Sequence, residues 1–281
     1  MAPNLILLSL SLLAGCTGEE QPAEQPEAQP AEQPAEQAVT PDVQFEPETL
    51  KAEAENVTLV PSPAEMQRAL ANAGLTSELA SMVSDKDIGT DVENLDQVAV
   101  RTGVILAEVV LTLKDAPKEK LVTRLESMKA GFVKLGAGND IPQTIDELIS
   151  SINNDLNRED LLDEVDLLSG AMVPELETEA GDWVVPLIQA GSWLEGAHLV
   201  SGAIESESKF DAAGSLLRQP EVVEYFLKYV QREGGEKAPD EVVKQLEATL
   251  VKLKEIASKP TLSAEDVKEI HAATGAVLSM L

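Results

Sequence analysis

The stretch VVPLIQAGSWLEGAHL, residues 184–199, decides the fold because it has the pattern of a helix that is apolar on nearly all its faces. A surface helix carries a single apolar stripe, whereas a helix that is apolar all around lies buried among other helices. Small side chains at positions 190, 191, 192, 196 and 197 let neighbouring helices approach closely, and Trp193 is the bulky exception. We therefore expect a central buried helix over residues 183–205.

Further helical patterns lie on both sides of this stretch. Two capping boxes, Ser62–Glu65 and Thr90–Glu93, predict helix starts, and Pro174 is expected to kink or end its helix. Apolar residues recur at helical spacing in the segments 95–113, 121–135, 145–152, 161–172, 210–217, 222–230, 241–257 and 263–281. The chain has no alternating strand pattern bounded by hairpin dipeptides.

These patterns predict an all-α fold, a multi-helix bundle of about nine or ten helices after a disordered N-terminal tether. The expected organisation is a signal peptide at 1–15, a lipidated tether at 16–56 and an all-helical domain at 57–281. Either that domain is one unit, or its helices form two subdomains divided near Pro174–Gly181.

Residues 190–196 carry a resemblance to a known family. The run Ala190 to Gly196 resembles the Ala-Gly-Gly-Trp-Ile-Glu-Gly type helix of a family of uncharacterised helical bacterial lipoproteins, with Ser192 in place of the second glycine. The resemblance extends to residues 61–75 and to a long middle helix at 91–113. It implies a helical fold and lipidation, and it implies no chemistry because the family has no established activity.

The first sixteen residues predict a lipid anchor. An uncharged apolar run, Leu5 to Leu13, leads into Ala14-Gly15-Cys16, and Cys16 is the only cysteine. The run is too short to span a bilayer, which takes roughly 20 apolar residues, but it fits a cleaved signal. We expect acylated Cys16 to hold the chain on a lipid bilayer of the bacterial cell envelope. Because Thr17 is not aspartate, the outer membrane is favoured; an ordinary signal peptide with a chance cysteine is the alternative.

The tether and the charge bear on the class of partner. Residues 16–56 hold a Pro/Glu/Gln/Ala repeat, which cannot bury enough apolar surface to order itself. The whole chain has 50 acidic and 21 basic residues. Such a surface repels phosphate backbones, so nucleic-acid binding is not expected. Either the acidity attracts basic partners or cations, or it only keeps a tethered domain soluble.

Glu195 is the residue to question on the predicted central helix, because a buried ionisable group must find a partner or become neutral. His198 follows three positions later, so the pair could form a Glu-x-x-His metal half-site. The second half-site is missing because Lys268, not glutamate, precedes His271; we expect no metal and no cofactor. Glu195 is then either structural, or it lines a ligand pocket with Trp193.

Catalytic signatures are absent from the sequence. There is no Gly-rich phosphate loop, no Gly-x-Ser-x-Gly elbow and no His-Glu-x-x-His. No catalytic residue is therefore assigned, and a binding or scaffolding protein that meets an envelope protein or polymer is expected. The alternatives are a small-molecule binding protein with a pocket beside helix 183–205, with contacts from Trp193, Glu195 and His198, and an uncharted hydrolase or metalloprotein.

Overall fold

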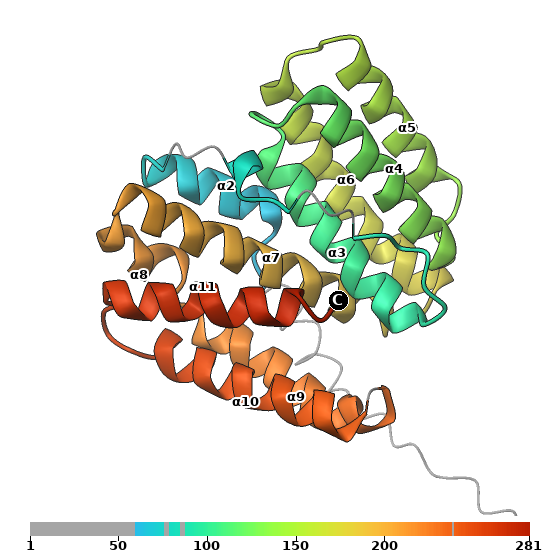
Figure 1. The fold of residues 1–281 in the computed structure, drawn as a ribbon. Helices are drawn as coiled ribbons and strands as arrows, with labels where there is room; N and C mark the ends of the chain where they lie inside the picture. Colours follow the sequence, from blue (N-terminus) through green and yellow to red (C-terminus); the bar gives the residue numbers. More distant parts are fainter. Residues whose placement is uncertain (1–59, 76–78, 85–87, 238) are drawn as a thin grey trace, which may run out of the picture. The chain divides into compact units, whose positions relative to one another are not determined.

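The computed structural model describes residues 60–75, 79–84, 88–237 and 239–281. Within them the chain forms ten α-helices, α2 to α11, and two short 3-10 helices, with no strand (Figure 1). The predicted all-α multi-helix fold is thus confirmed. The predicted signal peptide, Cys16 and the tether lie outside the described residues.

The helices follow one another with short connections. Those before the centre are α2 (Pro63–Asn72), η1 (Leu79–Ser81), α3 (Leu95–Thr112), α4 (Lys118–Lys134), α5 (Asp140–Asn153) and α6 (Arg158–Glu179). The central helix α7 spans Val184–Glu207. It is followed by η2 (Phe210–Ala212), α8 (Ala213–Leu216), α9 (Pro220–Lys237), α10 (Asp240–Ala257) and α11 (Ala264–Leu278).

Helix α7 is buried along most of its length, as its composition predicts, and it packs most closely on α3 and α11. Glycines make the contact with α3 possible. A Cβ atom on Gly103 would lie 2.0 Å from the Ile188 carbonyl oxygen, and one on Gly191 would lie 2.0 Å from that of Val100. These reciprocal contacts show that α3 and α7 run antiparallel with their backbones touching. Ser192 Oγ donates a hydrogen bond of 2.9 Å to the Gly103 carbonyl across this contact.

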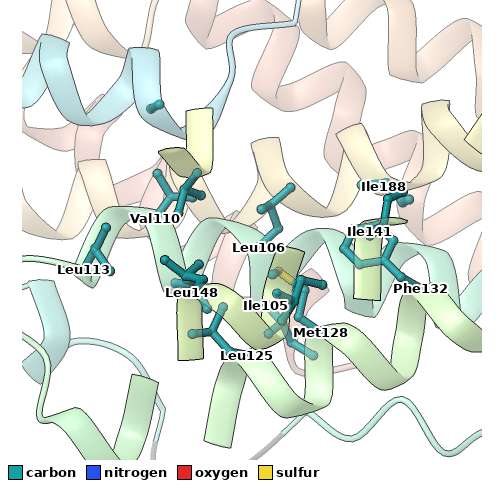
Figure 2. Close-up of a cluster of buried hydrophobic side chains, with 14 of the residues drawn as sticks. Ile105, Leu106, Val110, Leu113, Leu125, Met128, Phe132, Ile141, Leu148 and Ile188 are labelled. Carbon is teal, nitrogen blue, oxygen red and sulfur yellow. The ribbon is translucent and has the colours of Figure 1, made fainter. Parts of the chain in front are cut away.

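The apolar side chains form two core clusters. The first lies among α3, α4, α5, α6 and the start of α7, and Figure 2 shows a part of it, including Ile105, Met128 and Phe132. The second lies among α2, the rest of α7 and α8 to α11, and includes Trp193. Helices α3 and α7 contribute to both clusters. The described residues accordingly belong to one compact unit, without a division near Pro174–Gly181.

Local signals set most of the helix boundaries. Ser62 caps α2 through the predicted capping box, and Asn157 caps α6 by accepting a 3.2 Å bond from the Glu159 backbone N–H. The capping box predicted at Thr90 is wrong. Asn94 is the N-cap of α3 and accepts from the Gln97 N–H at 3.1 Å. Thr90 is buried instead, and its hydroxyl donates to the Ser127 carbonyl.

Pro174 does not end its helix, because α6 continues through it to Glu179. A proline in a helix interior removes one backbone hydrogen bond. The buried residues Leu161, Val165 and Leu176 anchor α6 in the first cluster on both sides of the proline. Burial of both parts therefore offsets the lost hydrogen bond and keeps the helix continuous.

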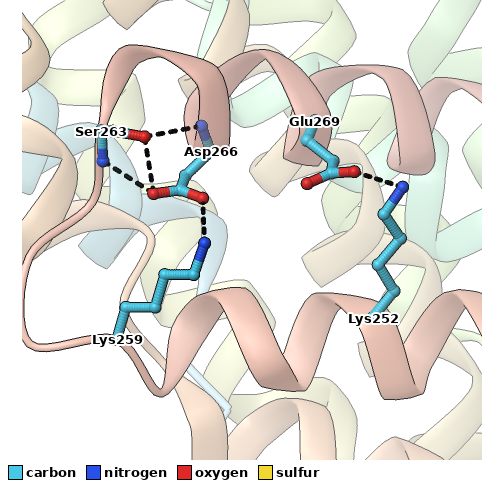
Figure 3. Close-up of polar contacts among 5 residues, drawn as sticks. All are labelled: Lys252, Lys259, Ser263, Asp266 and Glu269. Carbon is cyan, nitrogen blue, oxygen red and sulfur yellow. Dashed lines mark hydrogen bonds and ion pairs between the residues drawn. The ribbon is translucent and has the colours of Figure 1, made fainter.

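The start of α11 is fixed by charged contacts (Figure 3). Asp266 and Ser263 form a capping box. Lys259, which lies between α10 and α11, pairs with Asp266. The hydrogen bond from Lys259, with that from the Ser263 backbone, lowers the pKa of Asp266 to about 2. One turn along the helix, Lys252 of α10 pairs with Glu269. These contacts hold α11 against α10.

Candidate functional site

The three predicted site residues all lie on α7, but they face different neighbours. Trp193 and Glu195 are buried, with 6% and 5% of their surface exposed, and His198 is half-buried. At 100° per residue, Trp193 and Glu195 lie on opposite sides of the helix. The structure therefore gives each of them its own surroundings rather than one shared site.

Trp193 is a core residue of the second cluster. Its indole Nε1 donates a 2.9 Å hydrogen bond to Gln219 Oε1, and its ring packs on Phe226 with centroids 5.6 Å apart. The cavity beside it, lined also by Met66 and Leu253, has a volume of about 20 Å³. That is enough for about one water molecule. Trp193 thus fills the core and faces no space for a small-molecule ligand.

Glu195 belongs to a buried charge cluster that consists of Glu195, Glu108 of α3 and Arg124 of α4. Arg124 Nε lies 2.9 Å from Glu108 Oε2, and the Arg124 Nη2 donates to the Ser84 carbonyl at 2.8 Å. Burial, and after it the charge of Glu108, raise the pKa of Glu195 to about 8, against a smaller opposing effect of Arg124. At neutral pH the cluster is therefore an ion pair with a largely protonated Glu195 beside it.

The composition of this cluster supports the structural reading of Glu195. An arginine of a neighbouring helix, Arg124, is present in the cluster, and it pairs with Glu108. Sequence reasoning missed Glu108 and Arg124. The available signal was that Glu108 is the one acidic residue within the apolar run from residue 98 to residue 113.

His198 pairs with His271 of α11 and not with Glu195. The two rings stack with centroids 4.1 Å apart and planes 5° from parallel. His198 Nδ1 lies 3.1 Å from the His271 carbonyl oxygen, and His271 Nδ1 lies 3.0 Å from that of His198. Within the described residues, no group of three or more His, Cys, Asp or Glu side chains is arranged to hold a metal ion. The geometry gives no support to a Glu-x-x-His half-site.

Two further hollows do not have Trp193, Glu195 or His198 in their walls. One of about 230 Å³ lies beside η1 and the start of α4, with Arg124 in its wall. The other, of about 100 Å³, is mostly apolar and lies between Pro61–Pro63 and the start of α7. Pockets for drug-sized ligands measure about 300–1,000 Å³. Both hollows fall below that range.

Helices α5 and α6 are rich in acidic residues. Residues 140–179 contain twelve acidic residues and one basic residue, Arg158. The Arg158 guanidinium donates to the Leu113 and Ala116 carbonyls at 3.1 and 2.5 Å and so caps α3. Lys114, which follows α3, and two lysines on α4 pair with three of the acids, at Glu159, Asp155 and Asp146.

Other acidic side chains of these helices are exposed: Asp160, Asp163, Glu164, Glu177 and Glu179. Carboxylates crowd near the end of α6, where burial and then the charge of Glu179 raise the pKa of Glu175. We call the exposed carboxylates of α5 and α6 the acidic face. It presents concentrated negative charge that only a positively charged partner can neutralise.

Comparisons with protein families, curated proteins and solved structures gave no match to the chain. The resemblance at residues 190–196 to a lipoprotein family therefore stays a prediction. In the described part of the chain, none of the helices has the length and apolar character that crossing a bilayer requires.

Proposed function

We propose that the chain is a lipid-anchored lipoprotein of the bacterial cell envelope that binds a positively charged partner through its acidic face. The partner class is an envelope protein or polymer with basic groups. The acidic face on α5 and α6 is the observation that carries the proposal.

The anchor is argued from the sequence. The apolar run before Cys16 and the small residues at 14 and 15 fit a lipoprotein signal, and a thiol at Cys16 can carry a diacylglycerol. Two or more acyl chains hold a protein stably on a membrane. Thr17 favours the outer membrane over the inner one. The acidic Pro-rich segment that follows gives the helical domain reach from that surface.

The binding role is argued from charge and from the small cavities. An acidic face speeds the encounter with a basic partner and discriminates against anionic ones, including nucleic acids. The cavity beside Trp193 has room for about one water, so the pocket expected of a small-molecule binding protein beside α7 receives no support. Binding over a surface agrees better with this geometry.

The anchor is tested by fractionating cells that produce the full chain or Cys16→Ser. We expect the unchanged chain in the outer-membrane fraction with a mass that includes acyl chains, and the variant outside it. An unchanged distribution of the variant contradicts the anchor.

The acidic face is tested by changing five of its exposed acids, all on α6, to amides: Asp160, Asp163, Glu164, Glu177 and Glu179. The control changes five exposed acids elsewhere, Glu93, Glu126, Glu221, Glu255 and Glu265, and so removes the same charge. Binding to envelope extract is then measured at low and high salt. We expect the first variant alone to lose a salt-sensitive partner. Equal binding by both variants contradicts the proposal.

A further inference from the structure

A five-residue pattern, His-x-x-Ser/Thr-Gly, occurs on two helices that pack together. It spans residues 198–202, HLVSG, on α7 and residues 271–275, HAATG, on α11. In Figure 1, α11 runs alongside α7. The histidine, the hydroxyl residue and the glycine of each copy contact the other copy in a reciprocal way, so the two segments form a local pair related by a pseudo-two-fold axis.

The glycines make room for the histidine rings. A Cβ atom on Gly275 would lie 2.9 Å from His198 Cε1, and one on Gly202 would lie 3.1 Å from His271 Cε1. Each ring thus lies against the helix backbone at the glycine of the other copy. Any larger side chain at either glycine would push the facing ring away from its position.

The hydroxyl groups fix the protonation of the rings. Ser201 Oγ donates to the Ala197 carbonyl at 2.7 Å, and Thr274 Oγ1 donates to the Ile270 carbonyl at 2.8 Å. A hydroxyl has one proton to donate, so toward the facing ring each hydroxyl acts as an acceptor. The carbonyls of His271 and His198, which face the Nδ1 atoms of the two rings, also only accept. Each Nδ1 must therefore carry the proton, which leaves each Nε2 as the atom that takes up a second proton.

The surroundings of His198 disfavour the charged form of its ring. Burial comes first and the charge of His271 second in lowering the pKa of His198, and within the described residues no carboxylate contributes to this shift. Met82, which follows η1, lies beside Gly202 of α7 and carries no charge. On α11, Lys268 lies exposed one turn before His271 and adds positive charge. Two stacked imidazolium rings with centroids 4.1 Å apart would therefore repel each other.

We propose that this stacked histidine pair is a pH-sensitive latch, which holds α11 on α7 near neutral pH and releases α11 in acid. The closed pair excludes at least one proton that separated histidines bind near their ordinary pKa of about 6.5. For each proton that the closed pair excludes, the ratio of the open to the closed form therefore rises about tenfold per pH unit below that value. Release uncovers Val267 and Ile270 of α11, which are buried in the second core cluster.

The latch is tested by hydrogen exchange of the full chain at pH 7 and pH 5, with rates corrected for the intrinsic effect of pH. Helix α5 contains no histidine and serves as the internal reference. We expect the protection of α11 relative to α5 to fall at least tenfold between the two pH values. An unchanged ratio overturns the proposal.

The matched variant is the double change His198→Asn and His271→Asn. The asparagine amide nitrogen can donate to the same carbonyl as Nδ1 but does not titrate. We expect this variant to keep the same ratio of α11 to α5 protection at both pH values; a loss equal to that of the unchanged chain overturns the proposal.

A direct titration covers the case in which the variant does not fold. The two histidines of the unchanged chain are followed by NMR. We expect the proton on Nδ1 in both neutral rings and a His198 pKa below its ordinary value. Titration of His198 at the ordinary value overturns the latch.

Discussion

Glu195→Gln tests the charge cluster most sharply, because the amide has nearly the shape of the protonated carboxyl and cannot lose a proton. The folded-state pKa of Glu195 is about 8, above the ordinary value of 4.5. The folded chain therefore binds this proton more tightly than the unfolded chain does. The resulting stabilisation is complete below the unfolded pKa of 4.5 and is lost as the pH rises through 8.

The size of the effect follows from these two pKa values. Between pH 5 and pH 8 the contribution of Glu195 to the free energy of unfolding falls by roughly 3 to 4 kcal/mol, at about 1.4 kcal/mol per pKa unit. The variant lacks this fall, whereas groups that titrate elsewhere affect both chains alike. The difference in unfolding free energy between variant and unchanged chain should therefore shift by that amount in favour of the variant.

Urea unfolding followed by circular dichroism at both pH values measures this difference. Glu205→Gln is the control, because it makes the same change on the same helix. A constant difference for Glu195→Gln would refute the reasoning, since Glu195 would then be ionised or exposed in the folded chain. Failure of Glu195→Gln to fold at pH 5 would refute it as well.

Three other changes have defined outcomes. Gly191→Ala should destabilise the fold by about 3 kcal/mol or more, because its Cβ overlaps the Val100 carbonyl. Gly214→Ala, where a Cβ meets open space, should be neutral or stabilising. Thermal unfolding measures both. Arg124→Met should cost about 3–5 kcal/mol at pH 7, since it leaves Glu108 buried without its partner, and adding Glu108→Gln should restore part of that loss in a double-mutant cycle. Asp266→Asn should lower the protection of the first turn of α11 in hydrogen exchange above pH 4. It should have little effect near pH 2, because protonation of Asp266 then removes the same charge from the unchanged chain.

Much of the fold follows from local pattern. The apolar stretch 184–199 predicts a buried central helix, and Ser62 predicts a helix start; the structure confirms both. The prediction at Thr90 is wrong, and the helix does not end at Pro174, because long-range packing prevailed over local signals: Thr90 bonds to Ser127, and burial on both sides carries α6 past the proline. A capping pattern alone cannot show which hydroxyl will be buried by a distant helix.

The surroundings of the candidate residues were less predictable. Arg124 reaches Glu108 across two helices, and His271 meets His198 from 73 positions away, which periodicity within one helix cannot reveal. One signal was present in the sequence. The repeat of His-x-x-Ser/Thr-Gly at 198–202 and 271–275 places a ring, a hydroxyl and a glycine at matching positions, as a close antiparallel helix contact requires.

The central claim, partner binding through the acidic face, is tested most directly by photo-cross-linking in intact cells. A photoreactive residue replaces Glu164 on α6 in one chain and Lys244 on α10 in another; both positions are exposed. The proposal predicts a reproducible adduct with a basic envelope protein or polymer at position 164 that is absent at 244 and weakened by salt. An adduct of equal yield at both positions, or none at 164, would contradict it.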